Sequence, residues 1–144
     1  MTDVREAILA RLVEVVATVP NLIAVQRNNT DWPDILPAAL VLDGDEEVST
    51  GNDGSRPSNR PMLVEMTPEI EIVEQSDAIG SDLTTFRRDL MKLVLADATL
   101  NTLTGSNGKI SYLGCVTAFG WKEKNFGALQ MRFSFKYPLK PDDL

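Results

Sequence analysis

The residues best placed to do chemistry belong to a long polar stretch, residues 43–61, whose only large apolar side chain is Val48. Acidic side chains crowd its start and basic ones lie towards its end: Asp43, Asp45, Glu46, Glu47, Arg56 and Arg60. A compact domain seldom carries so long a connection unless it binds something or is disordered. The stretch therefore predicts a flexible loop that makes charged contacts with another molecule rather than one that performs catalysis.

The four acidic side chains also raise the question of a metal site, because carboxylate oxygens suit calcium and magnesium. Their spacing does not match an EF-hand loop, which needs a glycine at position 6 and a glutamate at position 12. We therefore expect a solvated or subunit-facing acidic patch here, and no bound metal.

Catalytic groups are sparse elsewhere in the chain. Histidine, the commonest general acid-base group and metal ligand, is absent, and no glycine-rich phosphate-binding motif occurs. One face of a predicted strand contains Glu65, Glu69 and Glu71. Two of these carboxyl groups could form an acid-base pair, but a solvent-facing strand carries the same residues. The single cysteine, Cys115, lies among apolar neighbours, so we expect a buried structural thiol. The sequence favours a non-enzyme without a cofactor.

Composition predicts a single domain over residues 1–144, since 43% of the residues are hydrophobic and this is typical of globular proteins. The net charge of −7 argues against sequence-independent binding to nucleic acid, which depends on Lys and Arg. Apolar runs are shorter than the ~20 residues of a membrane-spanning helix. The first residues do not resemble a signal peptide. We expect folding in the cytoplasm and no membrane partner.

Periodicity predicts two helices. Residues 3–18 place apolar side chains at helical spacings, and Asp3 and Glu6 are spaced as a capping box. A second apolar stripe covers residues 81–97, with Ser81 as the expected N-cap. Leu100 and Leu103 suggest a short turn after it.

Alternation predicts the strands, at residues 22–27, 38–42, 62–74, 109–121 and 127–137. Pro68 marks an edge or a bulge in the third strand, and Gly114 and Gly120 mark bulges or close backbone approaches in the fourth. Pro138 is expected to end the last strand, which leaves residues 138–144 as a loose tail. The fold class is therefore α+β: a two-layer domain with an antiparallel sheet of four to five strands and two helices on one face.

The two tryptophans flank turns. Trp32 and Trp121 are expected either to anchor the edge of the core or to lie in an interface, where aromatic residues are enriched. Trp121 joins the charged residues of the 43–61 stretch as a candidate interface residue.

The order of these elements, together with three segments, resembles one family. The segments are "NLIAVQRN", "ILPAALVLDGDEE" and "SYLGCVTAFGWKEKNFGALQMRFSFKYP", and the closest local echoes are Leu36-Pro37-Ala38 and residues 127–133. The chain resembles the tail terminator (tail completion) proteins of long-tailed bacteriophages and related tail-like particles.

The resemblance implies a structural role in a virion. Such a subunit forms a homohexameric ring at the head-proximal end of the tail tube, stops tube polymerisation and joins the tail to the head. The implied partners are further copies of the chain, the tail tube protein and the head-tail connector protein, with DNA passing through the ring without specific binding.

Two other roles stay open. One is a head-tail connector (stopper) or neck protein of the same assembly. The other is a small-molecule-binding regulatory domain, because helices over an antiparallel sheet also build ligand-sensing domains. That role requires a formed pocket with convergent polar groups.

Overall fold

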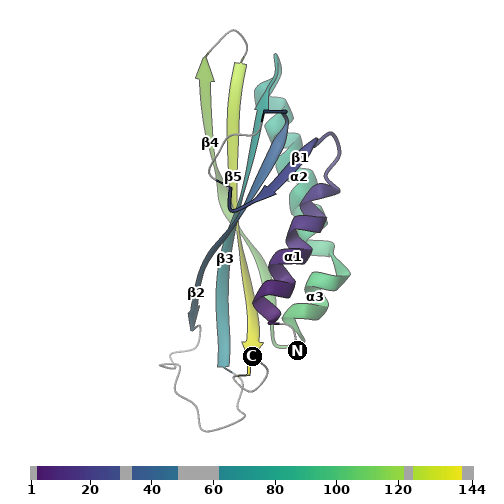
Figure 1. The fold of residues 1–144 in the computed structure, drawn as a ribbon, viewed down its shortest axis with the longest axis vertical. Helices are drawn as coiled ribbons and strands as arrows, with labels where there is room; N and C mark the ends of the chain where they lie inside the picture. Colours follow the sequence, from purple (N-terminus) through teal and green to yellow (C-terminus); the bar gives the residue numbers. More distant parts are fainter. Residues whose placement is uncertain (1–2, 30–33, 49–61, 122–124, 141–144) are drawn as a thin grey trace.

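A computed structural model describes residues 3–29, 34–48, 62–121 and 125–140. Within these residues the chain folds into a five-stranded sheet with three helices packed against one face (Figure 1). The elements in chain order are α1 (Val4–Ala17), β1 (Ala24–Arg27), β2 (Ala38–Val48), β3 (Met62–Gln75), α2 (Ile79–Ala96), α3 (Ala98–Thr104), β4 (Lys109–Trp121) and β5 (Asn125–Leu139).

The strand order is β1-β2-β3-β5-β4. The pairs β2–β3, β3–β5 and β5–β4 are antiparallel, whereas β1 and β2 run parallel, with Ala24 opposite Ala38. The predicted α+β class and two-layer arrangement are confirmed. The sheet is mostly antiparallel, as predicted, with one parallel pair at β1–β2, and α3 adds a third helix to the two that were predicted.

The helix boundaries follow from local hydrogen bonds. Asp3 caps α1 by accepting from the Arg5 amide at 2.9 Å, but Glu6 accepts from Arg27 instead of closing a capping box. Ser81 is not the N-cap of α2, because the Ser76 hydroxyl binds the Ala78 amide and Asp82 and so starts the helix earlier, at Ile79.

The turn expected around Leu100 and Leu103 is the separate helix α3. Asp97 caps it by accepting from the Leu100 amide at 2.9 Å, and the same carboxylate forms a two-bond ion pair with Arg11 of α1. A single side chain therefore separates α2 from α3 and ties both to the first helix.

β3 lies at the centre of the sheet although it contains Pro68. The irregularity predicted from this proline is present as a register shift in β2, between Leu42 and Asp45. Gly44 occupies the shift with a φ of +73°, and a Cβ there would lie 2.0 Å from the Thr67 carbonyl oxygen. Only glycine therefore fits this bulge.

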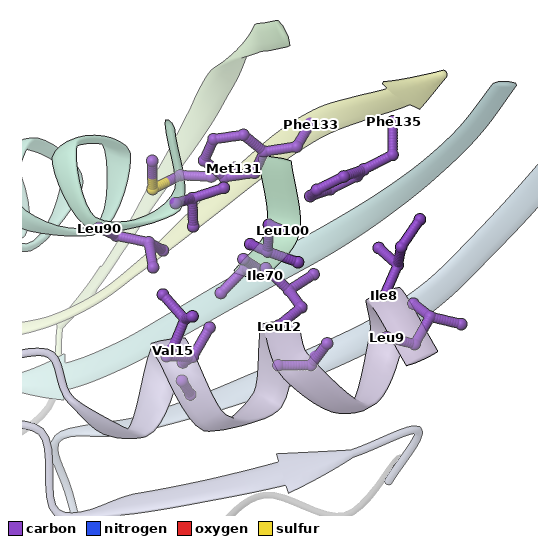
Figure 2. Packing of buried hydrophobic residues seen from close by; sticks show 14 of the residues in the cluster. Ile8, Leu9, Leu12, Val15, Ile70, Leu90, Leu100, Met131, Phe133 and Phe135 are labelled. Carbon is purple, nitrogen blue, oxygen red and sulfur yellow. The ribbon is translucent and has the colours of Figure 1, made fainter. Parts of the chain in front are cut away.

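The core lies between the helices and the facing side of the sheet (Figure 2). α1 contributes Ile8, Leu9, Leu12 and Val15, while Met131, Phe133 and Phe135 of β5 project towards them. The strict alternation of β5 thus reports burial of one face, as the sequence indicates.

The predicted starting points of the polar loop (residues 43–61) and of the C-terminal tail (residues 138–144) need correction. Residues 43–48 continue β2 rather than starting a loop, and Pro138 and Leu139 still belong to β5. Pro138 is tolerated because β4 begins opposite Lys136, so the residues beyond Lys136 pair only with β3. β5 also begins at Asn125, two residues before the predicted start.

Candidate assembly interface

The acidic run at residues 43–47 lies on the second half of β2, where the strand is an edge. β1 pairs with β2 only as far as Val41, so the residues beyond it have β3 as their one neighbouring strand in the described sheet. Because of the bulge and the strand alternation, the carboxylates of Asp43, Asp45, Glu46 and Glu47 point in different directions and do not converge on one site.

Asp43 belongs to an ion-pair network that links α1, β1 and β2. Arg27 donates Nε and Nη2 to the two oxygens of Asp43 at 2.9 and 3.0 Å, and donates Nη1 to Glu6 at 2.9 Å. The Arg27 guanidinium lowers the pKa of Asp43 below its ordinary value, against the opposing effect of burial. Asp43 is therefore engaged within the subunit, and Arg27 is a partner that the sequence did not reveal.

Glu46 is engaged as well. Its carboxylate accepts from the hydroxyl of Tyr137, a fully buried side chain of β5. Burial, followed by the hydrogen bond to Glu46, raises the pKa of Tyr137 above its ordinary value, so the phenol stays protonated and donates. This pair joins the acidic end of β2 to β5 across β3.

Asp45 and Glu47 remain as the outward-facing members of the run. Both are exposed, and neither makes a hydrogen bond or ion pair with another residue in the part of the chain that the structure describes. Glu47 lies directly opposite Glu65, and like charges facing each other across strands are unfavourable. These two side chains are the part of the run that is available for contact with another molecule.

Over residues 3–29, 34–48, 62–121 and 125–140, no three cysteine, aspartate or glutamate side chains come together in a way that could hold a metal ion.

Glu65 and Glu69 of β3 pair with β5 on the face away from the helices. Glu65 accepts from Ser134 at 2.8 Å and lies 3.7 Å from Lys136. Glu69 in turn accepts from Gln130 at 2.5 Å and lies 3.4 Å from Arg132. These cross-strand pairs stabilise the sheet and give Glu65 and Glu69 a structural role. Glu71, the third glutamate of the predicted set, lies opposite Gln130.

β4 is the other long edge, and it differs in character from the end of β2. Residues 110–121 include no charged side chain, yet Leu113, Val116 and Phe119 are 48%, 65% and 55% exposed. Gly114, with a φ of +120°, marks a bulge in this strand, as predicted. Gly120 instead pairs regularly with Phe126.

Cys115 is exposed, so the expectation of a buried structural thiol is wrong. The apolar neighbours that suggested burial are themselves on the edge strand, and exposure there reflects the absence of a further strand beside β4 in the described sheet. Trp121 is the last residue of β4 and pairs with Asn125.

A groove of about 300 Å³ runs between α2 and the helix-facing side of β4. Leu83, Phe119 and Leu129 supply its large apolar side chains, and Arg87 is the one charged residue among its described lining. Desolvation and a hydrogen bond with Cys115 raise the pKa of nearby Tyr112, while Arg87 acts in the opposite direction. The groove is an open surface feature beside the exposed strand.

The remaining predicted residues fall elsewhere. Trp32, Arg56 and Arg60 lie outside the described residues, as do positions 49–61 and 141–144 of the predicted loop and tail. None of the described helices has the length and apolar character needed to cross a membrane.

Comparisons with known proteins found similarity among solved structures. No family model matches the sequence, and no curated protein matches it. Among solved structures, the fold is similar to that of a chain in the "Virion of native gene transfer agent (GTA) particle". The two share 12% sequence identity with a TM-score of 0.45, over 94% of this chain and 92% of the other.

Proposed function

We propose that this chain is a structural subunit of a phage-like particle, a tail terminator whose copies form a ring on the head-proximal end of the tail tube. In this role it stops tube polymerisation and provides the surface to which the head connector joins. The partners are other copies of the chain, the tube protein and the connector protein.

The observation that carries the proposal is the exposed edge strand β4, in which residues 110–121 include no charged side chain. A 13-residue edge strand with three exposed large apolar side chains is a surface for association, since such edges otherwise cause aggregation. The opposite edge of the sheet, at β1, is distinct from β4. Contacts between two different surfaces of identical subunits generate a ring when the rotation closes.

Charge supports the same role. A net charge of −7 is suited to a ring through which DNA slides without being held, because nonspecific DNA binding requires cationic side chains. The exposed Asp45 and Glu47, with Arg56 and Arg60, are proposed contacts to the tube or connector, and Trp121 a proposed contact at the end of β4.

A connector (stopper) or neck protein of the same particle is the alternative assembly role, and the identity of the partner separates the two. Two hollows among the described residues favour a ligand-binding domain instead. One is the groove between α2 and β4, where Thr84, Arg87 and Thr117 lie beside apolar side chains. The other, of about 230 Å³, is lined by Asn21, Glu74 and Asp82 among others.

The test is native mass spectrometry of the purified chain, alone and with tail tubes assembled from the tube protein of the same particle. Electron microscopy of the tube ends is recorded in parallel. A ring of several copies, in solution or on the tube ends, supports the terminator role, and added chain must shorten growing tubes. A chain that stays monomeric, ignores tube ends and leaves tube length unchanged refutes it. Binding to the connector but not to tubes favours the connector role.

A further inference from the structure

We infer that neighbouring copies associate edge to edge, with β4 of one copy against the β1 edge of the next. This inference rests on the proposed ring, for which it identifies the two contacting surfaces. The argument depends on how the three free edges of the described sheet differ from one another.

The first free edge, the second half of β2, is protected against strand pairing. It contains a bulge at Gly44 and the four acidic residues of the run. Bulges and charged side chains on an edge are the usual means by which proteins prevent pairing with another strand. Strand pairing with another copy is therefore unfavourable at this edge, because the other copy also has a negative net charge.

The second free edge, β4, lacks this charge protection. Its bulge lies at Leu113–Gly114, and beyond it the strand runs from Cys115 to Trp121 without interruption and without a charged residue. Val116 lies opposite Gln130 and so projects from the face away from the helices, while Phe119 projects on the helix side. Both faces of the strand thus offer apolar contacts.

The third free edge, β1, is only four residues long and ends at Arg27, but two exposed apolar residues lie beside it. Ile23, just before β1, is 62% exposed, and Ile35, just before β2, is 60% exposed. The Ile23 amide donates to the Pro37 carbonyl at 2.9 Å, which brings the two segments together. Of the seven exposed large hydrophobic residues in the described part of the chain, three lie on β4 and these two lie beside β1.

The distribution favours a second copy as the occupant of β4. Because each copy carries a net charge of −7, association must use surfaces where this charge is absent, and β4 is such a surface. Apolar side chains gather at both ends of the strand order β1-β2-β3-β5-β4. In Figure 1, β1 lies on the right beside the helices, and the C-terminal half of β4 runs to the upper left, away from them. This polarity fits a head-to-tail contact rather than a twofold β4–β4 contact.

Disulfide trapping tests the inference directly. Cys115, the single cysteine of the chain, projects on the helix side of β4. Ile23 lies directly before β1, is 62% exposed, and donates its amide to the Pro37 carbonyl at 2.9 Å, so it is an accessible position beside the β1 edge. The Ile23→Cys variant, concentrated and mildly oxidised, is expected to form disulfides between position 23 of one copy and Cys115 of the next. The product is a ladder of covalent oligomers, and peptide mass mapping identifies the linked positions.

Three controls fix the interpretation. The wild-type chain and Ile23→Cys with Cys115→Ser each have one cysteine and can reach only dimers. Leu95→Cys places a thiol on α2, away from both edges, at a residue 38% exposed, and is expected to give no specific link to Cys115. Predominant Cys115–Cys115 disulfides, or a link from position 23 to Cys115 that forms no more readily than one in the Leu95→Cys control, overturn the inference.

A charge variant separates this inference from the proposed function. Val116→Lys places a cation on the exposed edge without disturbing the core, and it is expected to raise the concentration needed for assembly by about tenfold or more. Leu95→Lys is expected to leave assembly unchanged. If Val116→Lys assembles on tube ends like wild type, the edge contact is wrong while the terminator role stands. If the link between position 23 and Cys115 forms but neither the variants nor the wild type affects tubes, the edge contact stands and the terminator role is wrong.

Discussion

Replacing Phe133 by alanine tests whether the alternating face of β5 is core or interface. Phe133 is fully buried in the single subunit, and its ring lies 5.6 Å from that of Tyr112, centroid to centroid, at an interplanar angle of 54°. Phe-to-Ala substitutions at such sites cost about 3–5 kcal/mol, from lost transfer free energy and the cavity left behind. The tilted contact with Tyr112 is included in that figure.

The assay is thermal and urea unfolding followed by circular dichroism, at a concentration where the chain is monomeric, because assembly would add to apparent stability. For a chain of this size, 1 kcal/mol corresponds to a shift in Tm of about 2–4 °C. Phe133→Ala is therefore expected to lower Tm by about 6–20 °C. Phe133→Leu, which leaves a smaller cavity, keeps the test usable if the alanine variant does not fold.

The matched control is Val116→Ala, on the exposed edge strand, for which a change within about 0.5 kcal/mol is expected. If Phe133→Ala unfolds like wild type but fails to assemble, the alternating face is an interface and the packing in Figure 2 does not stabilise the subunit. Equal losses for Phe133→Ala and Val116→Ala would also contradict the distinction between core and edge.

Three further variants test local features. Gly44→Ala is expected to lower the free energy of unfolding by at least about 2 kcal/mol, because φ at this position is +73° and the added Cβ meets the Thr67 carbonyl. The control Gly80→Ala, with open space around the added Cβ, is expected to be neutral or stabilising. Equal effects of the two substitutions would contradict the bulge at Gly44. Asp97→Ala removes a helix cap and an ion pair and is expected to cost about 1–3 kcal/mol in the same unfolding assay, with Asn retaining part of the cap. Burial and a neighbouring carboxylate raise the pKa of Glu74 in the folded state, so Glu74→Gln is expected to raise Tm at pH 7. That gain should shrink as pH falls through the folded pKa towards the unfolded value, and a constant gain would contradict it.

Much of the fold could be predicted because one face of the sheet is buried. In β5 the apolar residues alternate without a break from Leu129 to Tyr137, and this pattern has only one reading. The apolar stripe of α2 is equally clear, and the errors there concern the first turn. Whether a helix starts at Ile79 or Ser81 depends on hydrogen bonds of Ser76, which no periodicity reveals.

The second half of β2 escaped prediction for a physical reason. An edge strand with charged side chains has no apolar alternation, and the bulge at Gly44 shifts the remaining pattern by one residue. Asp43, Asp45, Glu46 and Glu47 therefore look like a loop. In the structure Asp43 is ion-paired, Glu46 is hydrogen-bonded to a phenol, and Asp45 and Glu47 are exposed. These differences depend on partners far away in the sequence.

Cys115 shows the opposite error, in which an apolar context was taken to mean burial. Strand residues are buried only where another layer covers them, and β4 has a neighbouring strand on one side alone in the described sheet. The order of strands is a tertiary property, so the sequence cannot separate an apolar edge strand from an apolar central one. Residues 113–119 look like core in the sequence for this reason.

The contrast between the two long edges gives each proposed contact a different dependence on salt. A contact made by Asp45 and Glu47 with a basic partner is electrostatic and exposed, so it must weaken as ionic strength rises and the Debye length falls. A contact along β4 is apolar and joins copies that repel each other through their net charge of −7, so added salt must leave it unchanged or strengthen it. Assembly of copies and docking to a partner therefore respond to salt in opposite directions if β4 joins the copies and the acidic run meets the partner.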